Sequence, residues 1–348
     1  MRQVYVLRRR SRVFGALVCV ALGVTEIAWV VGDTETVGAQ ALARVWFGLT
    51  VAGVPLTSVV DLVLIGVYAG TAAAVSRPVG AGALGAAAAV TLALRLPSLW
   101  ILTAGWTQGA PSRQQLLLTV VAELAGAGVL LLTAVAGRRP AFGDDVVPVP
   151  ARVRVRVPAG LLLIAVALLE AGWQLYFVRF FAQNPTTGSY VRTITGEHAI
   201  PALLATPSGW LGWAIAALGL GTGVAALRRL PPARPLGIVL AWLVALTAAP
   251  DIGAWAQQGQ FLAFNLSDLA GLGSDVTLRQ LTLLFEIAAA VVLVVLLAPP
   301  GSGGPARAPD PFEARDTIEM QTMPSPANYL RQTPRVPPPP PPLPPRPW

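Results

Sequence analysis

Hydrophobic runs of about twenty residues recur along the chain, separated by short polar segments. Because about 20 apolar residues in a helix cross the hydrocarbon layer of a membrane, each run predicts a transmembrane helix. The fold class that this pattern predicts is an all-α integral membrane protein. We expect eight spans, at residues 13–32, 54–75, 80–103, 115–136, 159–179, 209–227, 236–257 and 280–298.

The composition agrees with a membrane protein. Hydrophobic residues make up 54% of the chain and charged residues 12%, whereas soluble domains carry about 25% charged residues. The net charge is +8, but the basic residues are all arginines that lie mostly in short loops between apolar runs. Such placement orients helices in a bilayer rather than binding phosphate, so we expect the lipid bilayer as a partner and no nucleic acid.

The distribution of arginines predicts the orientation of the spans. Fourteen lie in the N-terminal segment and in loops 76–79, 137–158 and 228–235, whereas the alternate loops hold only Arg44, Arg113, Arg192 and Arg279. The positive-inside rule then predicts a multi-pass plasma-membrane protein with both termini in the cytoplasm. The arginine-rich start also resembles a signal peptide, but Glu26 within the first run and its later copy favour a retained helix.

The longest internal loop divides the chain into two halves. We expect a four-helix unit at 1–136, a basic cytoplasmic linker at 137–158 and a second four-helix unit at 159–298. Matching landmarks in the same order indicate a 4+4 internal duplication, whose copies have parallel orientation because four is an even number. The landmarks are Glu26-x-x-Trp29 with Glu170-x-x-Trp173, Gly70-Thr71 with Gly221-Thr222, Pro97 with Pro250, and Glu123 with Glu286.

An arginine in the middle of the third span raises the question of what neutralises it. Glu26, Asp61, Arg95 and Glu123 each lie six to eight residues from the predicted outer ends of their spans, which is a depth of about 9–12 Å. A charge in hydrocarbon is costly, and a guanidinium suits carboxylates. We therefore expect Arg95 to face the other helices and pair with these acids.

The second half partly repeats this layer. Glu170, Asp251 and Glu286 fall at a similar depth, but Arg95 has no counterpart there. Two interpretations stay open: a polar zipper that holds the helices in register, or an outward-facing pocket that binds a proton, a cation or an amine. The ligand- or proton-binding candidates are Glu26, Asp61, Arg95, Glu123, Glu170, Asp251 and Glu286.

Metal and redox chemistry find little support in the sequence. The chain has one cysteine, Cys19, and one histidine, His198, too few for the usual zinc, haem or iron–sulfur sites or for a histidine-assisted nucleophile. We predict no cofactor, no metal site and no catalytic residue. The loop at 33–48 carries Asp33 and Glu35, followed by a segment with Trp46 and Phe47 that we expect at the membrane interface.

The last fifty residues differ from the rest. Residues 299–348 are rich in glycine and proline, which predicts a disordered cytoplasmic tail with polyproline II stretches. Pro341, Pro344 and Arg346 have the spacing of a ligand for SH3-type domains, so a cytoplasmic protein is a candidate partner.

Three functions remain for this sequence. The first is transport or permeation of a proton, a cation or a small cationic solute through the charged layer. The second is a non-catalytic scaffold that recruits cytoplasmic partners through its tail. The third is an enzyme that acts on lipid-linked substrates through Asp33 and Glu35. The scarcity of catalytic groups makes an enzyme the less favoured class.

Overall fold

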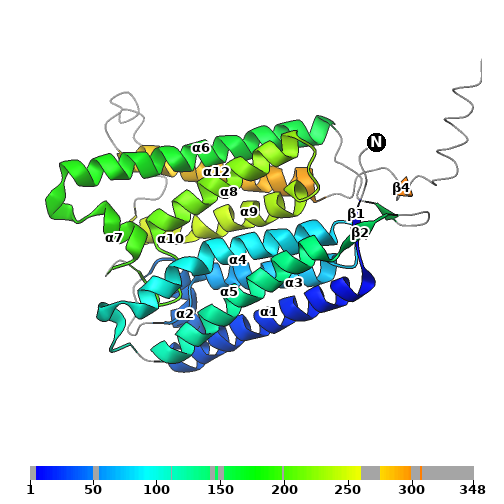
Figure 1. The fold of residues 1–348 in the computed structure, drawn as a ribbon. Coiled ribbons are helices and arrows are strands. Elements are labelled where there is room, and N and C mark those ends of the chain that lie inside the picture. Colours follow the sequence, from blue (N-terminus) through cyan, green and yellow to red (C-terminus); the bar gives the residue numbers. More distant parts are fainter. Residues whose placement is uncertain are drawn as a thin grey trace, which may run out of the picture.

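The computed structural model describes residues 5–49, 55–110, 112–141, 146–147, 153–197, 200–259, 275–298 and 306–307. These residues form two groups of long helices lying side by side, one blue to cyan and one green to orange in Figure 1. The first group is α1 (Arg9–Val37), α3 (Val59–Ala74), α4 (Gly80–Thr103) and α5 (Arg113–Ala136). The second is α6 (Val153–Gln183), α8 (Ser208–Leu227), α9 (Ala233–Thr247) with its continuation α10 (Ala249–Gln257), and α12 (Asp275–Leu297).

Short elements close the two ends of the bundle. One end carries α2 (Ala39–Trp46), α7 (Tyr190–Thr195), α10 and the 3₁₀ turns Gly105–Thr107 and Pro185–Thr187, and is called the α2/α7 end below (Figure 1). At the other end β1 (Tyr5–Leu7) pairs antiparallel with β2 (Arg138–Pro140), and β3 (Val146–Val147) pairs with β4 (Ala306–Arg307). The β1–β2 pair joins the N-terminal segment to the residues that follow α5.

Seven helices of the described chain are long and apolar enough to cross a membrane. The structure therefore supports a helical, multi-span membrane protein. The remaining predicted span, 54–75, contains the 16-residue helix α3, about 24 Å long at 1.5 Å per residue. The helix starts late because Ser58 and Asp61 form a capping box at its start. Ser58 has an extended backbone, and residues 55–57 before it are not helical.

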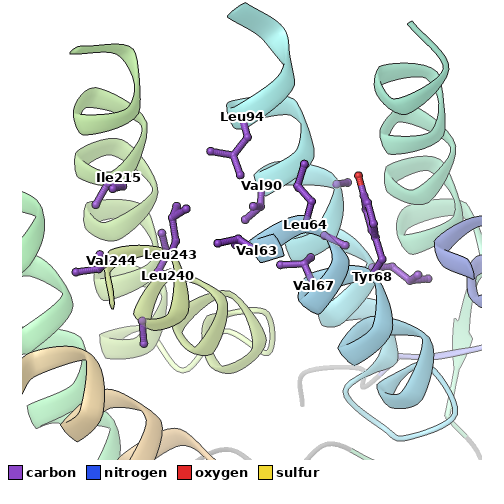
Figure 2. Packing of buried hydrophobic residues seen from close by; sticks show 14 of the residues in the cluster. Val63, Leu64, Val67, Tyr68, Val90, Leu94, Ile215, Leu240, Leu243 and Val244 are labelled. Carbon is purple, nitrogen blue, oxygen red and sulfur yellow. The ribbon is translucent and has the colours of Figure 1, made fainter. Parts of the chain in front are cut away.

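The same helix pairs recur in the two groups. In the first, α1 packs against α3 and α5, and α4 packs against the same two helices. In the second, α6 packs against α8 and α12, and α9 packs against the same two helices. The groups meet where α3 and α4 face α9, with α4 also touching α8. Figure 2 shows this seam, with Val63, Val67, Val90 and Leu94 on one side and Leu240 and Leu243 on the other, while Tyr68 points away from α9.

Large apolar side chains also cover the outside of the helices. Leu118, Leu132, Leu168 and Val295 are 61–68% exposed. Contiguous apolar surface of this kind is rare on soluble monomers, whereas lipid tails solvate it without cost.

The segment 137–158 differs from the expected linker. Helix α6 begins at Val153, so Arg154 and Arg156, which the predicted linker includes, belong to this helix, and Arg154 is exposed. Packing decides this local conformation: Arg156 Nη1 donates to the Leu227 carbonyl at the end of α8 at 3.4 Å. The predicted tail motif with Pro341, Pro344 and Arg346, residue His198 and most of the loop at 258–279 lie outside the described residues.

Candidate functional site

Four charged side chains meet inside the first group of helices, where the sequence predicts that they converge. This first cluster consists of Glu26 on α1, Asp61 on α3, Arg95 on α4 and Glu123 on α5, each with 0% exposure. Arg95 Nη2 donates to Glu26 Oε1 at 2.5 Å and to Asp61 Oδ1. Arg95 Nε lies 2.6 Å from Glu123 Oε2. One guanidinium thus contacts carboxyl groups from three helices.

Backbone groups complete the first cluster. Arg95 Nη1 donates to the carbonyl of Leu204 at 3.0 Å, in the segment between α7 and α8. Asp61 Oδ2 accepts from the Ser58 amide and, at 3.1 Å, from the Ser58 hydroxyl. The Arg95 guanidinium therefore contacts side chains of three helices and the backbone of the segment between α7 and α8, and it is fully buried. The carbonyl of Leu204 has no sequence signal, because it comes from the other half of the chain.

Pro97, two residues from Arg95, does not break its helix. Proline is disfavoured inside a helix, but α4 runs from Gly80 to Thr103 with Pro97 inside it. A proline leaves the carbonyl four residues before it without its helical partner, and Trp210 Nε1 donates to that carbonyl, of Ala93, at 2.7 Å. The matching Pro250 does coincide with a break, between α9 and α10.

Asp33 has a structural use. It is 3% exposed, and its Oδ2 accepts from the amide and the hydroxyl of Thr57 at 2.7 and 2.6 Å and from the Leu56 amide at 3.0 Å. These bonds hold the extended residues that lead into α3. Glu35 is exposed and does not join Asp33 in a site, which disfavours an enzyme built on the two acids.

A second cluster lies in the other group of helices and is held more loosely. It consists of Glu170 on α6, Asp251 on α10, and Arg279 and Glu286 on α12. Arg279 Nη2 is 3.5 Å from Asp251 Oδ2, and Arg279 Nη1 is 4.0 Å from Glu286 Oε1. The guanidinium also lies over the Trp173 ring, 5.4 Å from its centre. Burial is uneven, with Glu286 2% and the Asp251 side chain 45% exposed.

A cavity of about 610 Å³ separates the two clusters, and the second cluster lines it. All four of its charged residues face the cavity, as do Phe177, Phe180 and Phe181 of α6 and Trp255 of α10. Its size lies within the range of about 300–1,000 Å³ found for small-molecule sites. The sequence pattern points to the three acids and leaves an outward-facing pocket open as one interpretation, but it gives no sign of the aromatic wall of Phe177, Phe180, Phe181 and Trp255.

The cavity ends close to the first cluster. Ser58, which binds Asp61, lines it, as do Ala205 and Thr206, the neighbours of Leu204. Thr206 Oγ1 donates to the carbonyl of Leu94 at 3.0 Å. Residues that contact the first cluster, or that adjoin such residues in sequence, therefore also border the cavity. They lie at the ends of two connecting segments, one from each half.

A polar network borders the cavity on the side of α7. Tyr190 Oη donates to Gln174 Oε1 at 3.0 Å and accepts from Trp213 Nε1 at 2.7 Å. Partial burial raises the pKa of the Tyr190 hydroxyl, so the phenol stays neutral and keeps its hydrogen bonds. Gln174 lines the cavity, and this arrangement fixes the position of its amide.

Comparison with known proteins adds no assignment, since no family model, curated protein or solved structure matches the chain. The described residues contain no group of three His, Cys, Asp or Glu side chains suited to a metal ion. What the site offers is carboxylates, one loosely held guanidinium and aromatic rings around a cavity. Negative charge and aromatic faces both attract organic cations.

Proposed function

We propose that the chain is a plasma-membrane protein of eight spans, made of two repeated four-helix units, that carries a small organic cation across the membrane. The α2/α7 end faces outward in this proposal and both termini lie in the cytoplasm, because the arginine-rich loops are at the opposite end. Helix α3 counts as the eighth span, its extended lead-in of residues 55–58 making up its length.

Matching hydrogen bonds support the duplication. Trp29 Nε1 donates to Thr119 Oγ1 at 3.2 Å, and Trp173 Nε1 donates to Thr282 Oγ1 at 3.2 Å. In both units the tryptophan follows a buried glutamate by three residues, and the threonine precedes another by four. Side-chain bonds between the corresponding helices thus recur with the same spacing to the same acids.

A close contact between helices supports the same register. A Cβ atom added at Gly23 of α1 would lie 3.6 Å from the Cβ of Tyr68 on α3. A Cβ atom added at Gly219 of α8 would lie 3.1 Å from the Cβ of Ala167 on α6. Ala167 follows Gly23 by 144 residues, as Trp173 follows Trp29, and Gly219 follows Tyr68 by 151, as Thr222 follows Thr71.

The cavity is the observation that carries the functional proposal. Three carboxylates line it, and the nearest guanidinium comes no closer than 3.5 Å to any of them. Buried acids held so loosely retain attraction for a further positive charge. Glu170 and Glu286 are the binding groups in this proposal, with Asp251 toward the more exposed side.

The first cluster has a different role in this proposal. Arg95 already contacts all three of its acids, and none of the four side chains is exposed. Glu26, Asp61 and Glu123 are therefore not free to bind a solute, and Arg95 serves to hold the first unit together.

Uptake into proteoliposomes tests the proposal. The purified full chain is reconstituted and offered labelled methylammonium, tetramethylammonium and guanidinium, with empty liposomes as background. We expect saturable uptake of at least one cation and its loss in Glu286→Gln, which keeps the shape of the side chain but removes its charge. Glu35→Gln is the matched control, because Glu35 is an exposed acid outside the cavity.

Two results would contradict transport. One is the absence of saturable uptake or binding for every cation offered. The other is equal uptake by the Glu286→Gln variant and the unaltered protein. A scaffold function predicts both of these results.

A further inference from the structure

We infer that the cavity binds a guanidinium group, or a planar amidinium of the same shape, carried on an apolar or aromatic body. This inference rests on the proposed function and names its substrate class. The reason lies in the comparison of the two units, because the first unit contains a guanidinium of its own at the position that corresponds to the cavity of the second.

The register between α4 and α9 shows which residue of the second unit corresponds to Arg95. Helix α4 begins at Gly80 and α9 at Ala233, 153 residues later, and Pro97 and Pro250 are separated by the same interval. By this register the residue of the second unit that corresponds to Arg95 is Ala248.

The register between α3 and α8 likewise identifies the residue that corresponds to Asp61. Tyr68 and Gly219 differ by 151 residues, so Gly212 corresponds to Asp61. Both small counterparts, Ala248 and Gly212, line the cavity. At Ala248 the second unit therefore has cavity where the first unit has the Arg95 side chain. The place beside Gly212 is taken by Gln174, because a Cβ atom added at Gly212 would collide with Gln174 Nε2.

Two of the three acids that contact Arg95 in the first unit have an acidic counterpart in the second. Glu170 corresponds to Glu26, and Glu286 corresponds to Glu123. The lost aspartate is replaced from another helix, since Asp251 stands where the first unit has Ser98. The second unit thus retains three carboxylates around the space and lacks the cation that binds all three in the first.

One carboxylate oxygen of Glu286 has no hydrogen-bond partner among the described residues, although the Glu286 carboxyl shares a hydrogen bond with Glu170. Glu286 is 2% exposed and lines the cavity, and the oxygen without a partner is Oε1. Its nearest positive group is Arg279 Nη1 at 4.0 Å. A buried carboxylate oxygen in this situation is costly unless a donor reaches it. A guanidinium carries five such donors in one plane.

Arg279 does not take the place of Arg95. It enters from α12 rather than α9, and its side chain is 22% exposed. It stacks over Trp173, and its ion pairs are about 1 Å longer than those of Arg95. It reduces the negative charge at the rim while leaving the central space open.

The rest of the cavity wall explains the apolar body. A volume of about 610 Å³ exceeds what a guanidinium alone fills, and Phe177, Phe180 and Trp255 line the cavity. Aromatic faces favour both the cation and a ring attached to it. A neutral ligand of the same shape gains the ring contacts but leaves the carboxylates unpartnered.

Three compounds of similar size separate these contributions. Binding of phenylguanidine, benzylamine and phenylurea to the purified full chain in detergent micelles is measured by calorimetry. Phenylguanidine and benzylamine are both monocations, and phenylurea is the neutral analogue of phenylguanidine. We expect phenylguanidine to bind about tenfold or more tightly than benzylamine, because it pairs with two carboxylates at once, and phenylurea not to bind.

Variants locate the binding. Ala248→Arg places a guanidinium in the cavity as in the first unit, and we expect it to abolish phenylguanidine binding. Glu286→Gln is expected to weaken binding at least about tenfold, and Glu35→Gln, an exposed acid elsewhere, to leave it unchanged. If Ala248→Arg does not fold, the three ligands on the unaltered protein decide.

The outcomes separate the inference from the function on which it rests. Equal binding of benzylamine and phenylguanidine overturns the guanidinium assignment and leaves cation binding in place. Binding of neither cation overturns both. Phenylguanidine binding that Ala248→Arg leaves intact places the ligand elsewhere and overturns the inference.

Discussion

The two units build a charged cluster from corresponding helices and arrive at opposite results. In the first, Arg95 touches the carboxylates of three helices, two of them at 2.5 and 2.6 Å, and all four side chains are fully buried. In the second, the closest ion pair is 3.5 Å and a cavity of about 610 Å³ lies against the acids. In the proposed duplication, Ala248 stands where the first unit has Arg95. One helix position is thus proposed to make the difference between a packed cluster and a cavity.

The energetic meaning of the two clusters also differs. A buried ion pair gains little net stability, because desolvation offsets attraction, but removing one partner leaves an unpaired charge and costs about 3–5 kcal/mol. A partly exposed pair with long distances is worth about 0–1 kcal/mol. The first cluster is thus expected to be essential for folding, and the second is free to exchange partners.

The largest expected effect on stability comes from removing the arginine of the first cluster, Arg95, in comparison with Arg279 of the second. Arg95→Ala leaves three buried acids without their cation, and we expect the free energy of unfolding in mixed micelles to fall by about 3–5 kcal/mol. Arg279→Ala is the matched substitution in the second unit and is expected to cost about 1 kcal/mol or less. Losses of equal size would break the proposed division between the two clusters.

An intermediate loss of stability is expected from substitution of Asp33, which binds the residues that precede α3 in the first unit. In the proposed duplication, the counterpart of Asp33 is Phe177, a residue of the cavity wall, by the 144-residue interval between α1 and α6. Asp33→Asn weakens the charged hydrogen bonds to Leu56 and Thr57, and we expect a loss of about 1.5–3 kcal/mol.

Hydrogen exchange locates that effect. The amides of Leu56 and Thr57 should exchange faster in Asp33→Asn, while amides in the middle of α12 stay protected. Glu35→Gln, which changes a nearby exposed acid, is expected to alter neither rate. Unchanged exchange at Thr57 would argue against a structural role for Asp33.

The smallest effect tests the duplication itself. Trp29→Phe and Trp173→Phe each remove one hydrogen bond to a threonine on a neighbouring helix. Such bonds within membrane proteins average about 0.6 kcal/mol, so we expect small and similar losses of stability from the two substitutions. A loss confined to one of them, measured by unfolding in the same micelles, would weaken the proposed correspondence.

Much of the architecture is predictable from hydrophobic runs. Seven of the eight predicted spans contain helices long enough to cross a membrane, because length and apolarity alone determine that property. The start of α3 at Val59 is harder to predict from the sequence. The apolar stretch runs on before this point, but the cap at Ser58 starts the helix only at Val59. The start of α6 at Val153 is likewise decided by packing on α8 rather than by the alternation of arginine and valine.

The sequence by itself determined that ionisable groups lie within the spans and that Arg95 must be neutralised, since a charge in hydrocarbon has no other tolerable state. Only the tertiary structure decided which acids share Arg95, that Leu204 from the other half completes its shell, and that the second set of acids borders a cavity. The physical reason is that cost of burial is a property of each residue, whereas the space left between helices depends on side chains contributed by distant segments. Ala248 carries no signal in the sequence. Its proposed importance depends on its place in the cavity wall and on its correspondence to Arg95 in the proposed duplication.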